Sequence, residues 1–512
     1  MLNFKNNKMK KSIILIFIMT ISLFSCEDEL DIVNPNEVTN ESFWKNGADA
    51  IKGINSCYST LHRGAFSRWQ PMLYDIRSDV GTSTSPANEL ANALNNFIQP
   101  NSNFSAVSGT YFDNYVGINR ANQVLHNVPN INMDTNLQSR IIGEAYFFRG
   151  MHYYHLASLW GNVALQLAPS KPTDLPDTSS EADVWAQVIS DLTEASNRLP
   201  DTYSDVNDRG RITKGGALAL LAKAYMQIKD FPSAKTTLDY IVIGAGASNY
   251  DLVPNYADNF KVTSEFNVES VIEWDYIENP TEGTDDDTAT ANHNYGTSIG
   301  QFYGPPGIGF ADAEALRWVV DEFLIENTST NQRDPRLPAT FLYDNTNEAG
   351  PNSTLVYGAT WANRYGSNQR VFFRKFLHDH FKNSEGFRGT NNYRFIRYAD
   401  VLLMYAECLN ENGNTDDAYE FVDRVRARVG LPALPTGMSQ QDFLTQIKHE
   451  RLLELTGEGH RWNDLKRWGD LGPALTLKDP AFDNFITGKH ELLPIPQVDL
   501  DINPNLDQNP KW

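Results

Sequence analysis

Residues 296–300 read GTSIG, and this spacing matches the G-x-S-x-G nucleophile elbow of serine hydrolases. That elbow needs an apolar strand before the serine and a helix after it, so that the hydroxyl stands exposed at a sharp turn. Ser298 instead follows the polar run DDDTATANHN and precedes QFYGPPGIG, and neither stretch predicts the required element. We therefore expect no nucleophilic serine at this position.

Other catalytic and metal-binding patterns are absent or incomplete. His449 and His490 are each followed by glutamate but lack the second histidine of an HExxH zinc motif, and no Cys/His cluster has zinc spacing. Asp285–Asp287 offers oxygen ligands for calcium, but a solvated acidic loop is the simpler interpretation. A pair of glycosidase carboxylates is defined by its separation in space, which the sequence does not give. We predict no catalytic residue, no metal and no cofactor.

The N-terminus predicts a lipid attachment site at Cys26. Four lysines precede an apolar run that ends at Phe24, which is typical of a secretory signal. The run is too short for a spanning helix, which needs roughly 20 apolar residues. Residues 23–26 read LFSC and resemble a bacterial lipobox, although an ordinary signal with an incidental cysteine is the alternative. We predict a signal peptide over residues 1–25 and a lipidated acidic tether over residues 26–40.

The chain is acidic and rich in aromatic residues. It carries 43 basic and 64 acidic side chains, and loss of the four lysines with the predicted signal lowers the formal charge from −21 to −25. Nucleic-acid binding needs clustered Lys and Arg to meet the phosphates, so this balance argues against a nucleic-acid partner and, more weakly, against strongly anionic ligands. Aromatic residues make up 12% of the chain, and those not needed for the core would suit flat platforms for ligands.

Two stretches of the sequence share the tetratricopeptide pattern. Ala222 and Ala234 lie twelve positions apart, as do Ala406 and Ala418. The apolar residues at matching offsets are Leu221, Tyr225, Leu238 and Ile241 in the first stretch and Tyr405, Leu409, Val422 and Val425 in the second. Small residues let two antiparallel helices approach closely, and the apolar residues fill the seam between them. Any helical hairpin repeats apolar residues, but the match between two stretches favours a mainly α fold built on tetratricopeptide-like hairpins.

Residues 243–390 differ from the helical stretches on either side. They carry few sustained helical stripes and many Gly, Pro, Asn, Asp and Thr residues, and residues 268–276 alternate like a strand. We predict a loop-rich insertion with short strands in a single domain over 41–512, whose helical scaffold covers 41–242 and 391–512. Long loops on a rigid scaffold are where binding sites usually lie.

Residues 449–469 read HERLLELTGEGHRWNDLKRWG and are dense in charge. His460, Arg461 and Asp464 would suit a catalytic cluster by residue type alone. We expect instead that a helix ends near Gly457 and that its ion pairs lock it to the next helix.

These strings together resemble the SusD/RagB family of Bacteroidetes outer-membrane lipoproteins. The lipobox and acidic tether resemble its N-terminus, residues 140–163 its early helix, and residues 393–432 its late helix. Residues 449–469 and 492–512 resemble its closing segment, whereas the central loops match least. The resemblance implies a SusD-like fold, all-helical and with tetratricopeptide units.

The resemblance also implies a surface glycan-binding protein that is not an enzyme. Family members lie as a lid over a SusC-like TonB-dependent transporter and deliver oligosaccharides to it. The acidic run after Cys26 resembles the export signal of lipoproteins that reach the outer face of the outer membrane. We expect sugar rings to stack on Trp or Tyr while their hydroxyls bond polar side chains, with binding weak enough to permit release. On charge alone, a neutral α- or β-glucan is favoured over a uronate polymer.

Two groups of loop residues are predicted to bind ligand, because sites in this family form after the first helices and in the central insertion. The first group is Trp69, Gln70, Tyr74, Asp75 and Arg77. The second group is Asn294, Tyr295, Phe302, Tyr303, Trp318, Trp361, Asn363 and Tyr365. Ordinary packing is the alternative for each residue, and Asp75, Arg77 and Asp79 would equally form a structural ion-pair network. Only the lipid cysteine carries over directly from the family.

Two further hypotheses stay open. The same scaffold would also suit capture of a peptide or of the glycan of a glycoprotein. A surface hydrolase would use Ser298 or a carboxylate pair. A groove with exposed aromatic residues would favour glycan capture, whereas a deep pocket with converging acids would favour the hydrolase.

Overall fold

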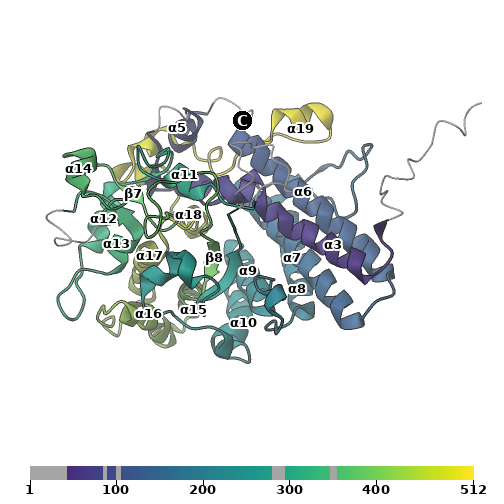
Figure 1. Ribbon diagram of the computed structural model, residues 1–512, viewed down its shortest axis with the longest axis horizontal. Helices are drawn as coiled ribbons and strands as arrows, with labels where there is room; N and C mark the ends of the chain where they lie inside the picture. The colour runs from purple at the N-terminus through teal and green to yellow at the C-terminus, as the bar shows by residue number, and fades with distance from the viewer. Residues whose placement is uncertain (1–42, 85–88, 100–104, 279–294, 346–354) are drawn as a thin grey trace, which may run out of the picture. The chain divides into compact units, whose positions relative to one another are not determined.

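The structure is a computed structural model that describes residues 43–84, 89–99, 105–278, 295–345 and 355–512. The chain divides into two units, Met1–Lys45 and Asn46–Trp512, and the second unit carries the fold (Figure 1). Helices predominate in it and its strands are short, so the prediction of a mainly α fold is confirmed. Over the described residues we find no helix with both the length and the apolar character that crossing a membrane requires.

Four long helices from the first half of the sequence pack against one another (Figure 1). They are α3 (Gly47–Tyr58), α6 (Ser105–Asn127), α7 (Thr135–Leu159) and α8 (Glu181–Arg198). Asn46, Asp134 and Ser180 cap three of them, because each side-chain oxygen accepts a hydrogen bond from a first-turn N–H group. Helix α7 contacts the other three, and every residue from 147 to 159 is buried. A helix that is buried on all sides forms the centre of a core.

The two predicted tetratricopeptide-like hairpins are present. The first joins α9 (Lys214–Gln227) to α10 (Phe231–Val242), and the second joins α15 (Tyr398–Glu411) to α16 (Thr415–Arg428). The four alanines at the predicted close approaches, Ala222, Ala234, Ala406 and Ala418, are all 0% exposed. Helix α10 also packs against α15, so the two hairpins form one helical layer although 155 residues separate them in sequence.

The charged string near the C-terminus is structural, as expected. Helix α17 (Gln440–Leu455) ends just before Gly457, and α18 (Arg461–Trp468) follows. The Arg451 Nε atom of α17 lies 2.9 Å from Asp464 Oδ2 of α18, and both side chains are buried. Ion pairs therefore lock the two helices together.

A two-stranded sheet closes the base of the insertion. Strand β4 (Ser270–Trp274), which confirms the strand predicted over 268–276, pairs antiparallel with β8 (Tyr393–Arg397). Two further sheets are formed by β1 (Gly81–Thr82) with β5 (Glu314–Ala315) and by β6 (Phe341–Leu342) with β7 (Phe372–Phe373). The insertion helices are α11 (Ile299–Tyr303), α12 (Arg317–Phe323), α13 (Arg336–Thr340) and α14 (Trp361–Tyr365).

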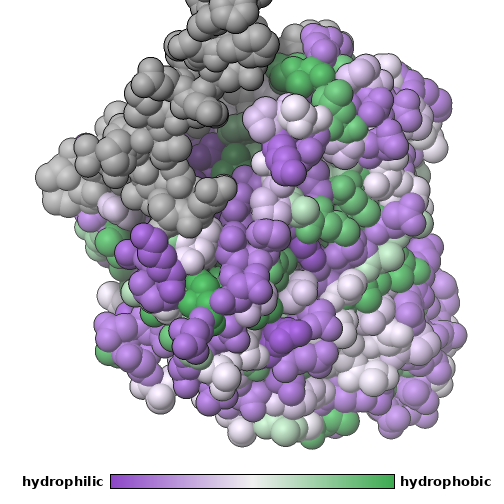
Figure 2. Space-filling view, turned by 90° about the vertical axis from the view of Figure 1, so that its right-hand side faces the viewer, coloured by the Kyte–Doolittle hydropathy of each residue, from purple (hydrophilic) through white to green (hydrophobic). Residues whose placement is uncertain are grey.

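Short elements complete the fold. They are α4 (Gln70–Asp75), α5 (Glu89–Asn95), α19 (Gln497–Ile502) and the paired strands β2 (Val163–Ala164) and β3 (Thr178–Ser179). On the face seen in Figure 2, hydrophobic residues gather in separate patches within a mostly hydrophilic surface, among the residues drawn in colour. Folded proteins commonly expose such scattered apolar residues.

Candidate functional site

The first predicted group of ligand-binding residues lies inside the protein. Trp69, Gln70, Tyr74, Asp75 and Arg77 are between 0% and 6% exposed. Helix α4, which carries three of them, packs against α18 and the turn at 65–69. A side chain buried to this extent presents no surface to a sugar, and we correct the prediction for this group.

The polar atoms of this buried group tie distant parts of the chain together. Gln70 and Tyr74 form hydrogen bonds of 2.8 and 3.1 Å to Nδ1 of His155 on α7. Arg77 donates to the backbone carbonyl of His490 at 2.9 Å, and its guanidinium lies 4.1 Å from the centre of the Trp462 ring. These contacts anchor α4 to the central helix and to the C-terminal segment. Among the described residues, the suggested ion pairs of Arg77 with Asp75 and Asp79 do not form, and Asp79 pairs instead with Arg461 at 2.7 Å.

Asp75 joins three parts of the chain at one buried carboxyl group. The Tyr303 hydroxyl donates to its Oδ2 atom at 3.0 Å, and the Gly459 N–H donates to its Oδ1 atom at 3.2 Å. Burial raises the pKa of Asp75 to about 7, although these two hydrogen bonds and the charge of Lys375 act in the opposite direction.

Substituting Asp75→Asn is expected to change how stability depends on pH. The folded carboxyl keeps its proton up to about pH 7, whereas the unfolded carboxyl loses it near its ordinary pKa of 3.8, so the contribution of Asp75 falls as the pH rises between these values. The free energy of unfolding of the variant, relative to wild type, should therefore rise by up to about 3 kcal/mol between about pH 5 and pH 8. Urea unfolding at a series of pH values measures this difference. A difference that is constant with pH would contradict the assignment.

Phe302 and Tyr303 of the second predicted group are also buried, at 5% and 1% exposed. The Phe302 ring centre lies 5.2 Å from that of Trp69 and 5.5 Å from that of Phe310. Phe310 is 44% exposed, and sequence reasoning missed it. We correct the prediction for Phe302 and Tyr303. Both side chains are buried, and Phe302 packs beneath the exposed ring of Phe310.

Asn294 lies outside the described residues. Tyr295 is 40% exposed and lies beside a cavity that also contains Asp275. Tyr295 therefore lies apart from α12 and α14, which carry the other exposed or half-buried members of the second group that the structure describes.

The remaining four predicted residues are carried by two short helices of the insertion. Trp318 lies on α12, and Trp361, Asn363 and Tyr365 lie on α14; Figure 1 shows both helices on the left-hand side of the view. Strand β5 leads directly into α12, and the Ala315 N–H donates to the Val371 carbonyl next to β7. The sequence contains no pattern that links these helices. We call Glu314, Trp318, Trp361, Asn363, Tyr365 and Arg370 the insertion platform.

Aromatic packing fixes the position of helix α14 in the insertion platform. The ring centres of Trp361 and Tyr365 are 4.9 Å apart, and that of Trp361 is 6.0 Å from that of Phe372 on β7. Trp361 is only 4% exposed, so we correct the prediction for this residue too, and its ring supports its neighbours. Asn363 is exposed and Tyr365 is half-buried. The Tyr365 hydroxyl donates to the Pro306 carbonyl at 3.0 Å, which fixes the direction of its ring.

An ion pair forms the polar part of the insertion platform. Arg370 Nε and Nη2 donate to the two carboxylate oxygens of Glu314 at 2.6 and 2.8 Å. These hydrogen bonds raise the pKa of Arg370, so its guanidinium stays charged. Its Nη1 atom has no acceptor among the described residues. Trp318 is half-buried, and Lys478 Nζ lies 3.9 Å from the centre of its ring, so one face of that ring is occupied.

The serine of the G-x-S-x-G match lacks a catalytic environment. Ser298 is 4% exposed and precedes the five-residue helix α11. Its hydroxyl accepts from Arg68 Nε at 3.3 Å and lies 3.4 Å from the Ser67 carbonyl oxygen, and neither is a general base. Asp285–Asp287 lies outside the described residues. Within the described ranges, no group of His, Cys, Asp and Glu side chains is arranged to hold a metal ion.

Comparison with known proteins identifies the family. The model of the SusD family matches residues 269–512, and a second model, described as "Starch-binding associating with outer membrane", matches residues 72–226. The chain belongs to the SusD family. SusD-like protein P25 of Formosa agariphila is 27% identical over 532 aligned positions, which cover 98% of each chain.

Solved structures of SusD proteins share the fold. A SusD superfamily protein from Bacteroides vulgatus has a TM-score of 0.80 and 25% identity, with 92% of this chain and 100% of that chain covered. A laminarin-binding SusD-like protein has a TM-score of 0.75 and 28% identity over the same shares of the two chains. The expected membership of the SusD family and the SusD-like fold are therefore confirmed.

Proposed function

We propose that this SusD-family chain captures an oligosaccharide or polysaccharide and passes it to a SusC-like TonB-dependent transporter without cleaving it. The observation that carries the proposal is the 28% identity to a laminarin-binding SusD-like protein along the whole of that chain. The insertion platform supports it, because it combines a half-buried tyrosine ring with a charged guanidinium and an exposed amide. The environment of Ser298 weighs against hydrolysis.

Each part of the insertion platform has a role in this mechanism. Tyr365 presents a fixed ring against which the apolar face of a sugar stacks. Arg370 Nη1 and the Asn363 amide supply donors, and the amide oxygen also accepts from a hydroxyl group. Few contacts per sugar give weak binding to each unit, and a longer chain gains affinity by occupying several positions. Weak binding of each unit favours release to the transporter.

A neutral glucan is the proposed ligand class. Laminarin is a neutral β-glucan, and the formal charge of −25 after loss of the predicted signal would repel a uronate polymer. The chain would act at the outer face of the outer membrane, anchored through a lipid on Cys26, which lies outside the described residues. The family description that links its members to the outer membrane supports this location.

Substituting Tyr365→Ala is expected to weaken binding of laminarin by about tenfold, or about 1.4 kcal/mol, because the stacking surface is lost. Calorimetry of the soluble chain that begins after Cys26 measures this change, alongside maltohexaose and a polyuronate. Tyr365→Phe is the matched control, because it keeps the ring and should bind within about twofold of wild type.

Unchanged affinity in Tyr365→Ala would exclude the insertion platform as the laminarin site. Release of reducing ends during the assay would overturn the non-catalytic role. Binding of no glucan at all would overturn glucan capture itself.

A further inference from the structure

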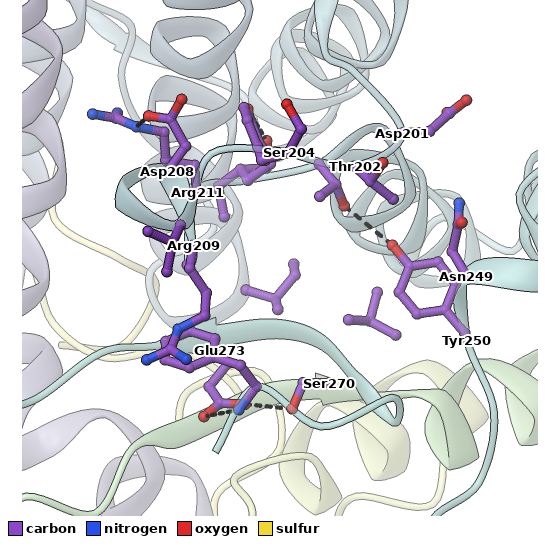
Figure 3. A pocket seen from close by; sticks show the side chains of 18 of the residues that line it. Asp201, Thr202, Ser204, Asp208, Arg209, Arg211, Asn249, Tyr250, Ser270 and Glu273 are labelled. Carbon is purple, nitrogen blue, oxygen red and sulfur yellow. Dashed lines mark hydrogen bonds and ion pairs between the residues drawn. The ribbon is translucent and has the colours of Figure 1, made fainter. Parts of the chain in front are cut away.

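A cavity that lies apart from the insertion platform shares no residue with it. It has a volume of about 390 Å³ and lies between residues 201–213, before α9, and the strand β4 (Figure 3). A second cavity of about 250 Å³ shares four residues with it, namely Arg209, Gly210, Arg211 and Glu273. We call the two together the Arg209 groove. Ligand pockets typically have volumes of about 300–1,000 Å³, and the combined groove falls in this range.

Arg209 is the exposed cation at the junction of the two cavities. Figure 3 shows its side chain extending from the loop toward the strand that carries Glu273. Its guanidinium lies 4.9 Å from the centre of the Phe266 ring, and it forms no ion pair with a carboxylate of the described residues. The neighbouring Arg211 differs, because it pairs with Asp208 at 2.6 Å and with Glu144 at 2.9 Å. The donors of Arg209 are therefore available to a ligand.

The second cavity adds a stacking surface and an acceptor. Tyr295 is 40% exposed, and its backbone carbonyl accepts a hydrogen bond from the Ile277 N–H at 2.9 Å. Its ring centre lies 5.9 Å from that of His62, so the ring is supported on one side. Asp275 is exposed and has no hydrogen-bond or ion-pair partner among the described residues. One cavity thus offers a ring, a free carboxylate and, through Arg209, a free guanidinium.

This combination fits an uncharged polyhydroxyl ligand. Asp275 would accept a hydrogen bond from a hydroxyl group, Arg209 would donate to a ring or hydroxyl oxygen, and Tyr295 would stack on the apolar face of the ring. An anionic ligand is disfavoured, because the exposed carboxylates of Asp201 and Asp205 also line the groove.

We propose that the Arg209 groove is a second binding site for neutral oligosaccharides, separate from the insertion platform. This inference rests on the proposed function, since it assigns the same class of ligand to a second surface. Two sites on one anchored chain raise the effective concentration of a long glucan at each of them. A polymer that dissociates from one site therefore stays bound at the other. A short oligosaccharide occupies the two sites independently.

The test uses the soluble chain that begins after Cys26, with one fluorinated tyrosine as the probe at each proposed site. One protein carries 3-fluorotyrosine in place of Tyr295, and a second carries it in place of Tyr365. Each is titrated with laminarihexaose and, separately, with maltohexaose, and the ¹⁹F resonance is followed. We expect saturable shifts of both resonances with the same hexasaccharide, and with different dissociation constants.

The outcomes separate this inference from the proposed function. A shift at position 365 alone would overturn the second site and leave glucan capture at the insertion platform in place. A shift at position 295 alone would support the Arg209 groove and remove the insertion platform as a site. No shift at either position with either sugar would overturn both.

Substituting Arg209→Ala should raise the dissociation constant measured at position 295 by at least about tenfold, as expected for loss of a charge-assisted hydrogen bond. The dissociation constant measured at position 365 should not change. Arg198→Ala is the matched control, because Arg198 is an exposed arginine on α8 that pairs with Glu194 outside the groove. Equal effects of the two substitutions would mean that charge alone matters and would overturn the role of Arg209.

Discussion

Substituting Arg397→Met is expected to destabilise the fold by about 3–5 kcal/mol, because it removes a shared cation from a buried cluster of carboxylates, whose other partners are Arg428, Arg336 and Lys375. Arg397 is 0% exposed and lies 2.6 Å from Glu269, 2.9 Å from Glu454 and 2.8 Å from Glu458. All three glutamates are also buried. Urea unfolding followed by circular dichroism measures the change in the free energy of unfolding.

The matched control for this prediction is Arg424→Met. Arg424 pairs with Asp251 at 2.6 Å, but its side chain is 39% exposed and that of Asp251 is 64% exposed. A solvent-exposed pair contributes about 0–1 kcal/mol, so this variant should stay close to wild type. If the free energy of unfolding fell by similar amounts in the two variants, burial of the Arg397 network would add nothing to its contribution to stability.

The Arg397 network has a consequence for the binding surfaces. Arg397 lies on β8 and Glu269 lies next to β4, which together close the base of the insertion. Glu454 and Glu458 belong to the end of α17 and the turn that follows it. Burial alone would raise the pKa of Glu458, but Arg397 and Lys375 hold that pKa below its ordinary value. The network therefore keeps the insertion fixed on the helical scaffold, so that both proposed sites stand on rigid supports.

The helical scaffold could be predicted from the sequence because its determinants are local. Ala222 and Ala234 belong to one hairpin, and their spacing alone specifies the close approach of the two helices. The same applies to the ion pair between Arg451 and Asp464, which are thirteen positions apart in a string that shows the helix end at Gly457.

The first predicted group of site residues was wrong because its burial depends on distant contacts. Gln70 and its partner His155 are 85 positions apart, and Arg77 lies 413 positions from His490, to whose carbonyl it donates. A polar and aromatic stretch resembles a ligand site as long as its internal partners are unknown. Once the fold supplies those partners, the same side chains form hydrogen bonds inside the protein.

Arg209 and Arg370 could not be predicted as site residues from the sequence, because their surroundings also depend on distant contacts. Arg209 and Arg211 are two positions apart on one loop, and only the fold shows that Arg211 meets Glu144 while Arg209 meets an aromatic ring. Arg370 likewise becomes part of the insertion platform through Glu314, which lies 56 positions away.

Substituting Gly117→Ala is expected to destabilise the protein by about 1–3 kcal/mol through overpacking between α6 and α7. A Cβ atom at this position would lie 1.9 Å from Nε2 of His152. The imidazole has little room to move, because its Nδ1 atom lies 3.1 Å from Asn114 Oδ1 and its Nε2 atom lies 3.3 Å from the Thr60 hydroxyl. Thermal unfolding of the variant, compared with wild type, measures the loss.

Gly109→Ala in the same helix separates this steric effect from helix propensity. No atom lies within 4 Å of a Cβ atom at position 109, so the change should stabilise the protein by up to about 1 kcal/mol, as alanine does in place of glycine inside a helix. The two substitutions are chemically identical, and only the neighbour differs. In a His152→Ala background the clash is gone, so Gly117→Ala should then resemble Gly109→Ala. If Gly117→Ala stays destabilising in that background, the cost comes from the backbone of α6, and the close packing of α6 on α7 at His152 is not its cause.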